Sequence, residues 1–303
     1  MSKPATQHRQ EIIATLNDVT IIVPAKNEAA TIGQLLDRIF SVATESEIIV
    51  VNDGSTDDTS TIAESKGAIV VNHKDSRGNG AAVKTGIRHA SRKWIAILDA
   101  DGQHPPEIIP DLLKQAEQGY DMVVGARGKK HQASLPRMMG NQIYNALAGA
   151  VVGKTIPDLT SGFRLARRDK LSEFIPLYPN GFSLPTTSTM AFFRAGYQVG
   201  FHPFDADQRI EGSASHIRLV KDGARFFLII FRVGTLYSPL KIFLPISASI
   251  GVGGLAYSVY TLLEMGRFTN FGALSLSTAL IVFLIGLLSE QVTNLMYLNA
   301  RNR

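Results

Sequence analysis

The chain has 303 residues, with 31 lysines and arginines, 26 aspartates and glutamates, and no cysteine. This length allows one large domain or two smaller ones. The lack of cysteine excludes disulfides, thiolate metal sites and cysteine nucleophiles. The seven histidines show no H-E-x-x-H spacing, which argues against a zinc hydrolase. The first ten residues are polar, so we expect no secretory signal there.

The excess of positive charge is confined to the C-terminal part of the chain. Residues 1–216 carry 23 basic and 23 acidic side chains, whereas residues 217–303 carry 8 and 3. A nucleic-acid-binding protein would spread basic residues over a folded face, with aromatic residues among them. Here the basic residues lie beside apolar runs, so we expect a lipid bilayer as a partner and no nucleic acid.

Short apolar runs rich in β-branched residues alternate with amphipathic segments of helix length in the first two thirds of the chain. This alternation predicts an α/β domain with a parallel sheet that is covered by helices on both faces. Ligands of such sheets bind beyond the carboxyl ends of the strands. The predicted strands are residues 19–24, 47–52, 68–72, 94–99 and 121–125.

Two aspartates close the fourth predicted strand, in the stretch ILDADGQHPP (97–106). On a strand, Asp99 and Asp101 would point to the same face. Two like charges side by side repel each other, and a divalent cation would offset that repulsion. The alternative is a solvated turn, because Asp, Gly and Pro are all turn residues.

The second predicted strand ends in NDGST (52–56). Asp53 could accept hydrogen bonds from a ribose or a base edge. Ser55 and Thr56 could instead cap the next helix, which would make this stretch a simple turn. The glycines of GNGAAVKTG (78–86) resemble part of a dinucleotide fingerprint, but they follow the third strand rather than the first. We therefore expect Gly78 and Gly80 to serve helix packing.

Two runs without charged residues stand near the C-terminus, at residues 242–263 and 271–289. Each has about the ~20 residues that a helix needs to cross a hydrocarbon core. The connector 264–270 suits a tight helical hairpin. Buried helices of a soluble core are the alternative, but the glycines of the first run suit a membrane span better, since they allow close helix approach.

Residues 216–241, which precede the first run, predict a basic amphipathic helix at the membrane interface and a short linker. An ordinary surface helix is the alternative. Five basic residues precede the first span, one lies in the hairpin loop and two follow the second span. By the positive-inside rule, both termini and the large domain should face the cytoplasm. The basic residues of this helix are Arg218, Lys221, Arg225 and Arg232.

Five motifs in this order resemble those of the family-2 glycosyltransferases: VPAKNEAATI, VVNDGSTDDT, GNGAAVKTGI, LDADGQHPPE and VGAR. Within that family the chain is most similar to the polyprenyl-phosphate sugar transferases, the group like dolichol-phosphate mannose synthase. The resemblance covers residues 19–235. The two predicted spans are similar to the C-terminal hairpin of bacterial membrane-anchored members.

The resemblance implies an A-type glycosyltransferase fold, with a mostly parallel, Rossmann-like sheet, that binds a nucleotide-sugar and Mg²⁺ or Mn²⁺. The implied metal ligands are Asp99, Asp101 and Gln103. The implied catalytic residues are Asp99, Asp101, Arg127 and Arg209. The residues implied to bind the nucleotide-sugar are Pro24, Lys26, Glu28, Val51, Asp53, Asp99, Ala100 and Asp101. Contacts with the acceptor phosphate are implied for Arg137, Arg209 and Ser161.

The chain departs from the family pattern at two places. Lys26 stands where many members have tyrosine, which puts base stacking there in doubt. GSASH (212–216) replaces the Ser-Lys that often follows the position of Arg209, which leaves His216 or Arg218 for any cationic role there.

The expected activity is an inverting transfer of a sugar from a UDP- or GDP-linked donor to a polyprenyl phosphate at the inner membrane, as part of cell-envelope chemistry. A glycan or protein acceptor, or a catalytically silent membrane adaptor, is the alternative. The sequence leaves the oligomeric state open, a homo-oligomer included. The expected organisation is a polar tail (1–16), a catalytic domain (17–215), a juxtamembrane helix and linker (216–241) and a two-helix membrane hairpin with a short tail (242–303).

Overall fold

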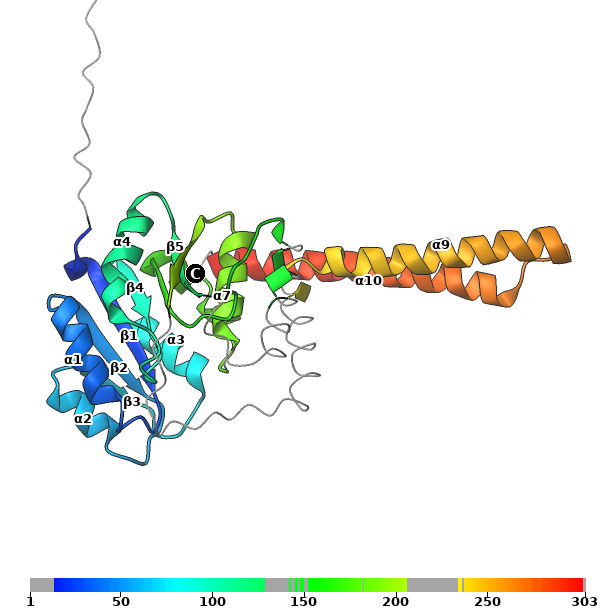
Figure 1. The fold of residues 1–303 in the computed structure, drawn as a ribbon. Helices are drawn as coiled ribbons and strands as arrows, with labels where there is room; N and C mark the ends of the chain where they lie inside the picture. The colour runs from blue at the N-terminus through cyan, green and yellow to red at the C-terminus, as the bar shows by residue number, and fades with distance from the viewer. Residues whose placement is uncertain are drawn as a thin grey trace, which may run out of the picture.

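The computed structural model describes residues 14–128, 152–181, 183–205 and 237–301, together with residues 142, 145, 146, 148, 149, 234 and 235. A domain built around one sheet is followed by a long hairpin of two helices that projects away from it (Figure 1). The elements are η1 (Leu16–Asp18), β1 (Val19–Ala25), α1 (Ile32–Val42), β2 (Glu47–Asn52), α2 (Thr59–Ser65), β3 (Ile69–Asn72), α3 (Asn79–His89), β4 (Trp94–Ile97), η2 (Pro106–Ile108), α4 (Ile109–Glu117), β5 (Met122–Arg127), β6 (Arg164–Arg167), α6 (Arg168–Glu173), η4 (Ile175–Leu177), α7 (Leu184–Arg194), β7 (Val199–Phe204), α9 (Pro239–Met265) and α10 (Asn270–Arg301).

Within the described part of the chain, the sheet has seven strands in the order β3-β2-β1-β4-β6-β5-β7. All neighbouring pairs are parallel except those of β6, which runs antiparallel to both β4 and β5. The five predicted strands are confirmed, and β6 and β7 are additions that the sequence did not predict. Because β6 runs the other way, its first residue lies at the same edge of the sheet as the carboxyl ends of β4 and β5.

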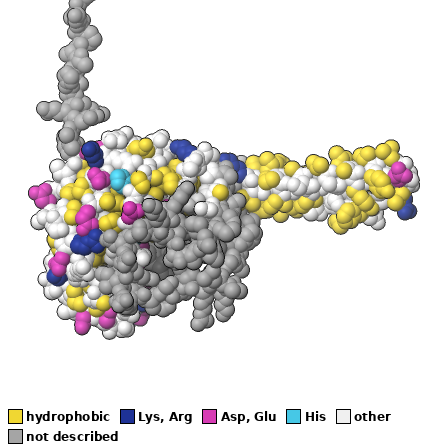
Figure 2. Space-filling model, in the orientation of Figure 1, with side chains coloured by type: hydrophobic (Ala, Val, Ile, Leu, Met, Phe, Trp, Pro, Cys, Tyr) yellow, Lys and Arg dark blue, Asp and Glu magenta, His cyan; other side chains and the backbone are white. Residues whose placement is uncertain are grey.

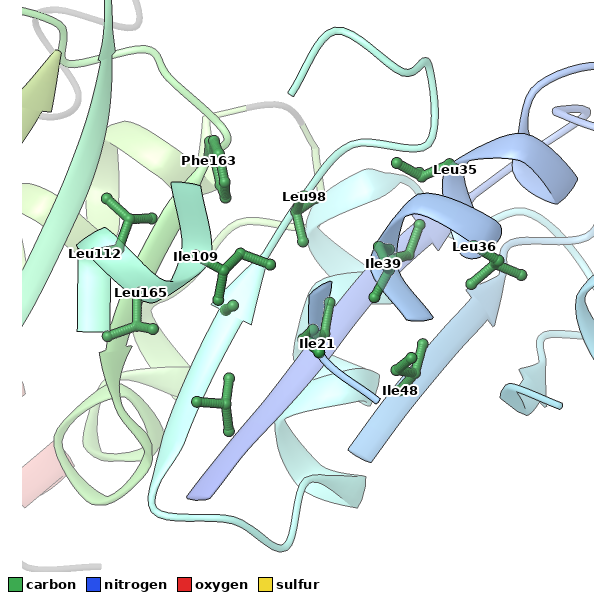
Figure 3. Close-up of a cluster of buried hydrophobic side chains, with 14 of the residues drawn as sticks. Ile21, Leu35, Leu36, Ile39, Ile48, Leu98, Ile109, Leu112, Phe163 and Leu165 are labelled. Atoms are coloured by element: carbon green, nitrogen blue, oxygen red, sulfur yellow. The ribbon is translucent and has the colours of Figure 1, made fainter. Parts of the chain in front are cut away.

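Apolar side chains of alternate strand residues pack on opposite faces of the sheet, as strand geometry requires. On one face, Ile21 and Ile48 pack against helices α1 and α4 (Figure 3). On the other face, Ile22 and Ile49 pack with residues of α3, α6 and α7. Burying each such side chain contributes roughly 1.5–3 kcal/mol. The prediction of a sheet covered on both faces is confirmed.

The fourth strand is shorter than predicted. It ends at Ile97 rather than Asp99, and the next residues form a turn in which Gly102 has a φ of 75°. The turn begins because the amide of Asp99 donates to the Nδ1 atom of His104, at 3.1 Å, instead of to a neighbouring strand. The expectation that Asp99 and Asp101 share one face of a strand is therefore wrong, because both belong to the turn that follows it.

The glycines of residues 78–86 serve packing, as predicted. Gly78 precedes α3 with a φ of 99°. At Gly80, a Cβ atom would collide with backbone oxygens of residues 179–181, and at Gly86 it would collide with the side chain of Ile22. These glycines allow α3 to lie close to β1 and to the segment that precedes α7.

Helices α9 and α10 are long and apolar enough to cross a membrane, and they replace the predicted spans 242–263 and 271–289 with longer helices. Figure 2 shows that their surface is mainly hydrophobic, with charged side chains at the far tip. The helices approach closely where small residues meet. A Cβ atom at Gly254 would lie 2.8 Å from that of Ser275, and the hydroxyl of Ser247 donates to the carbonyl of Ala279 at 2.7 Å.

Candidate active site

The predicted site residues that the structure describes lie at one edge of the sheet, where β1, β2, β4 and β5 end. The loops after these strands are tied to one another. The hydroxyl of Thr31 donates to the carbonyl of Ala100 at 2.8 Å, which joins the loop after β1 to the turn that carries the aspartates. The amide of Glu28 donates to the hydroxyl of Thr59 at 2.9 Å, which joins the same loop to the start of α2.

The acidic pair lies at the open end of β4. The side chain of Asp99 is 40% exposed, and that of Asp101 belongs to a half-buried residue. One carboxylate oxygen of Asp101 accepts a hydrogen bond of 3.1 Å from the amide of Gln103. A Cβ atom at Gly162 would lie 2.5 Å from the Oδ2 atom of Asp99. Only a residue without a side chain leaves room for the Asp99 carboxylate in this position.

His104 stabilises the turn that carries Asp99 and Asp101. The sequence predicted no role for this residue. Its ring is buried and stacks on Phe163 at 5.2 Å between centroids, with the edge of Phe204 at 6.0 Å. Burial lowers the pKa of His104, although the charges of Asp99 and Asp101 oppose this effect. A neutral ring agrees with the hydrogen bond in which Nδ1 accepts from the Asp99 amide, because the proton then resides on Nε2.

Arg127, at the end of β5, is held by Asp158. Its Nε and Nη2 atoms donate to the two carboxylate oxygens of Asp158, at 2.8 and 3.1 Å, and Nη2 also donates to Thr160 at 2.8 Å. These bonds do not use the Nη1 group of the guanidinium. Burial opposes the charge of Arg127, but Asp158, followed by Asp99 and Asp101, raises its pKa. The arginine therefore stays charged beside the acidic pair.

A second arginine, Arg164, is fully buried at the end of the loop of residues 160–164. Its Nη1 group donates to the carbonyl of Pro185 at 2.8 Å and to the hydroxyl of Ser188 at 2.5 Å, and its Nη2 group donates to the carbonyl of Ser161. Burial lowers the pKa of Arg164 to about 10, so its guanidinium remains charged at neutral pH. Arg164 fastens the loop of residues 160–164 to the first turn of α7.

Ser161, an expected contact of the acceptor phosphate, also belongs to this loop. Its hydroxyl is buried and makes no hydrogen bond to the part of the chain that the structure describes. Such an orphaned buried hydroxyl costs free energy unless a ligand or a water satisfies it. It is therefore compatible with the expected contact.

Asp53 lies at the same edge but is only 3% exposed. Its carboxylate accepts hydrogen bonds from Ser76 and from the amides of Arg77 and Gly78, at 2.8–2.9 Å, and it contacts the Nδ1 atom of His73 at 2.7 Å. Burial would raise the pKa of Asp53, but these bonds hold it at about 2. In the structure, the Asp53 carboxylate stabilises the conformation of residues 73–78. A contact between Asp53 and a base or ribose stays a prediction.

The other residues expected to bind the nucleotide-sugar lie in or directly after β1, β2 and β4. Pro24 and Val51 are paired neighbours in β1 and β2, and both are buried. Lys26 is exposed and Glu28 is half-buried in the loop after β1. Ala100 is buried between the two aspartates. All of these lie at the edge where the sequence placed them, and their contacts with a donor stay predictions.

Several expected residues lie outside the described part of the chain. They are Arg137, Arg209, His216, Arg218, Lys221, Arg225 and Arg232. The predicted amphipathic helix therefore stays a prediction.

The acidic pair fits a divalent cation that shares its coordination with a substrate. Among the described residues, no three His, Cys, Asp or Glu side chains lie close enough together to hold a metal ion alone. Mg²⁺ commonly uses one or two carboxylates and completes its shell with substrate phosphates and water. Asp99 and Asp101, which are partly exposed at an open strand end, supply such carboxylates. The side-chain amide oxygen of Gln103 is a further candidate ligand two residues after Asp101.

Comparison with known sequences identifies two family models that match this chain. The model of glycosyl transferase family 2 matches residues 20–175, and that of the GtrB C-terminal hairpin matches residues 238–295. The glycosyltransferase AglJ of Haloferax volcanii is 28% identical over 82% of this chain and 83% of its own length. The dolichyl-phosphate hexose transferase of the same organism is 32% identical over 52% of this chain and 70% of its own. An undecaprenyl-phosphate 4-deoxy-4-formamido-L-arabinose transferase of Proteus mirabilis is 33% identical, and the match spans 56% of this chain and 58% of that relative.

The fold agrees with solved structures of A-type glycosyltransferases. Glucosyl-3-phosphoglycerate synthase from Mycobacterium tuberculosis in complex with UDP superposes with a TM-score of 0.58 at 20% identity, covering 77% of this chain and 86% of that one. Its complex with Mn²⁺, UDP and phosphoglyceric acid gives 0.57 at 22% identity, covering 70% and 75%. The strand order, the acidic turn at the carboxyl edge and the matched ranges lead to one assignment: this chain belongs to glycosyl transferase family 2, with an A-type catalytic domain and a C-terminal hairpin of two apolar helices.

Proposed function

We propose that the protein is a membrane-anchored, metal-dependent, inverting glycosyltransferase that moves a sugar from a UDP- or GDP-linked donor to a polyprenyl phosphate. The observation that carries this proposal is the position of Asp99 and Asp101 beside Arg127, in a chain that also carries an apolar hairpin. The acceptors that the relatives' names give, undecaprenyl and dolichyl phosphate, support the choice of acceptor class.

In this reaction, an oxygen of the acceptor phosphate attacks the anomeric carbon, and the bond from that carbon to the nucleoside diphosphate breaks. A metal bound to Asp99 and Asp101, with Gln103, would supply Lewis-acid stabilisation of the departing diphosphate. Arg127, with its orientation fixed by Asp158, would place a permanent positive charge beside the same group. The acceptor is a phosphate monoester with a second pKa near ~6, so it is mostly dianionic at neutral pH and needs no strong general base.

The remaining residues would hold the two substrates in line. Pro24, Lys26, Glu28, Val51, Asp53 and Ala100 would shape the donor site. Arg137 and Arg209, with Ser161, would face the acceptor phosphate. With both termini in the cytoplasm, the domain would act at the cytoplasmic face of the inner membrane.

The experiment is a screen of radiolabelled UDP- and GDP-sugars with polyprenyl phosphate in membranes that contain the protein. The proposal expects label in a lipid-linked product whose anomeric configuration is the inverse of the donor's. Label on a glycan or a protein would instead support a different acceptor class. Transfer from none of the donors to any acceptor would favour a silent adaptor.

A further inference from the structure

Helix α7 joins the candidate active site to the membrane hairpin. Arg164 contacts the N-terminal turn of α7. Its guanidinium donates hydrogen bonds to the carbonyl of Pro185 and to the hydroxyl of Ser188. The same guanidinium bonds the carbonyl of Ser161, next to Gly162, which lies against Asp99. The body of the helix is buried from Thr186 to Phe193. One end of α7 is thus fixed to the loop beside the acidic pair.

The other end of α7 is fixed to α10. Arg194, the last residue of α7, donates from Nη2 to the carboxylate of Glu290 at 3.1 Å and to the amide oxygen of Asn294 at 2.6 Å. Its guanidinium also lies 5.0 Å from the ring centre of Tyr297. The side chains of Arg194 and Glu290 are only 13% and 20% exposed, so this pair is largely shielded from solvent.

Glu290 reaches the start of the other hairpin helix as well. Its second carboxylate oxygen accepts from the amide of Leu240 at 3.2 Å and from the hydroxyl of Ser238 at 3.5 Å. A negative charge at a helix N-terminus satisfies amides that have no partner within the helix and suits the helix dipole. One carboxylate therefore links α7, α9 and α10.

The last turns of α10 extend beyond the length that a membrane requires. The helix has 32 residues, or about 48 Å at ~1.5 Å per residue, whereas the hydrocarbon core is ~30 Å thick. Its run without charge ends at Ser289, directly before Glu290. Beyond that point Tyr297 and Ala300 are buried among core residues of the catalytic domain, and Tyr297 lies 5.8 Å from Phe174. Figure 1 shows this end of α10 beside α7.

We propose that α7 is a strut that fixes the catalytic site relative to the bilayer, and that Arg194 and Glu290 are positioning residues for an acceptor embedded in the membrane. This inference rests on the proposed lipid-phosphate acceptor. A phosphate at the bilayer surface has a fixed height, and the sugar carbon must reach it to within ~3–3.5 Å. A catalytic domain that tilts on its hairpin would lose this alignment, whereas a freely diffusing acceptor would still find the site.

The first test compares two acceptors with the full-length protein in lipid nanodiscs. One acceptor is a long-chain polyprenyl phosphate in the bilayer, and the other is a short, water-soluble prenyl phosphate. For Arg194→Ala and Glu290→Ala, we expect the rate with the bilayer acceptor to fall about tenfold more than the rate with the soluble one, with an unchanged KM for the nucleotide-sugar. Arg194→Lys should recover part of the loss. Arg167→Ala, which removes the exposed pair with Asp169, is the matched control.

The outcomes separate a positioning role from a merely structural one. Because the residues act as one unit, the double variant should lose no more than the worse of the single variants. Equal losses on both acceptors, or full activity with the bilayer acceptor, would overturn the strut.

A second readout does not depend on catalysis. The chain has no native cysteine, so spin labels can be placed at Glu45→Cys in the domain and Val252→Cys in the hairpin, both of which are exposed positions. We expect a narrow distance distribution that broadens in Arg194→Ala and not in Arg167→Ala. An unchanged distribution would contradict the strut. If the distance distribution broadens in Arg194→Ala but the protein uses neither acceptor, α7 does fix the domain relative to the hairpin and the proposed function is wrong.

Discussion

Gly162 lies against Asp99 so closely that a Cβ atom there would approach the Oδ2 atom of Asp99 to 2.5 Å. The carboxylate of Asp99 is 40% exposed, so it can swing away from an added methyl group more readily than the loop backbone can move. The absence of a side chain at position 162 in one loop therefore permits the observed direction of the Asp99 carboxylate in another.

We expect Gly162→Ala to lower the transfer rate about a hundredfold, because a displacement of ~1 Å at a reacting site has that effect. Gly181→Ala is the control, since a Cβ atom there would have no heavy atom of the described residues within 4 Å, apart from its chain neighbours. Rates at saturating substrates and unfolding temperatures of both variants provide the measurement. Equal activity of the two variants would show that the position of Asp99 does not matter.

Variants of the ion pair between Arg127 and Asp158 should show that its effect on stability differs from its effect on activity. Asp158 is 6% exposed, so Arg127→Gln leaves a buried carboxylate without the guanidinium that neutralises it, and among the described residues only neutral donors such as the Thr160 hydroxyl remain. We expect a cost of about 3 kcal/mol. The double variant Arg127→Gln/Asp158→Asn removes both charges and should recover most of that stability. It should remain about ten- to a hundredfold less active, because the proposed contact of the Arg127 guanidinium with the departing diphosphate is lost. Denaturant unfolding and transfer assays on the three proteins test this, and an active double variant would remove Arg127 from the mechanism.

Asp53 should contribute to stability in a way that depends on pH. Its pKa is about 2 in the folded protein, against 3.8 for an unperturbed aspartate, a difference worth roughly 2 kcal/mol. Because the folded-state pKa is the lower one, this contribution is fully present above about pH 4 and is lost as the pH falls towards 2. The unfolding temperature of Asp53→Asn should therefore lie below that of the wild type at pH 7, and the gap should close between pH 4 and 2. A gap that persists at pH 2 would contradict this account.

The arrangement of basic residues around the two hairpin helices predicts that both termini face the cytoplasm. Reporter fusions after Arg303 and before Met1 should both give cytoplasmic signals. A fusion at the hairpin connector, near Arg267, should report the opposite side. Termini on opposite sides would leave a single span and reject the hairpin as a membrane-crossing unit.

Much of the fold was predictable because its signals are local. Five strands show as continuous apolar runs, and the hairpin shows as two runs without charge. Strand β6 was not predictable in the same way, because its sequence RLAR carries two arginines. One of them, Arg164, is buried only because carbonyls and hydroxyls distant in sequence accept its hydrogen bonds.

The sequence predicted the edge of the sheet at which the site lies. It did not predict the side-chain contacts within the site. Asp99 and Asp101 were found because they follow an apolar run, and Arg127 was found through the resemblance to glycosyltransferase motifs. Asp158 was missed as a partner of Arg127, since 31 residues separate them. His104 was missed although it stands close to both aspartates, because only the structure reveals that its ring nitrogen accepts the Asp99 amide. The sequence suggested Asp53 as a donor contact, whereas its four protein partners were too far along the chain to foresee.

The central claim is that the acidic turn of Asp99 and Asp101 holds a divalent cation that transfer requires. The most direct measurement is transfer of radiolabelled sugar to polyprenyl phosphate by the wild type, Asp101→Asn and the exposed control Asp111→Asn, each before and after EDTA treatment. We expect Asp101→Asn and EDTA each to reduce transfer below about a hundredth of the wild type, Mg²⁺ or Mn²⁺ to restore the treated wild type, and Asp111→Asn to behave as wild type. Transfer within about threefold of wild type in Asp101→Asn, or in the metal-free protein, would contradict the claim.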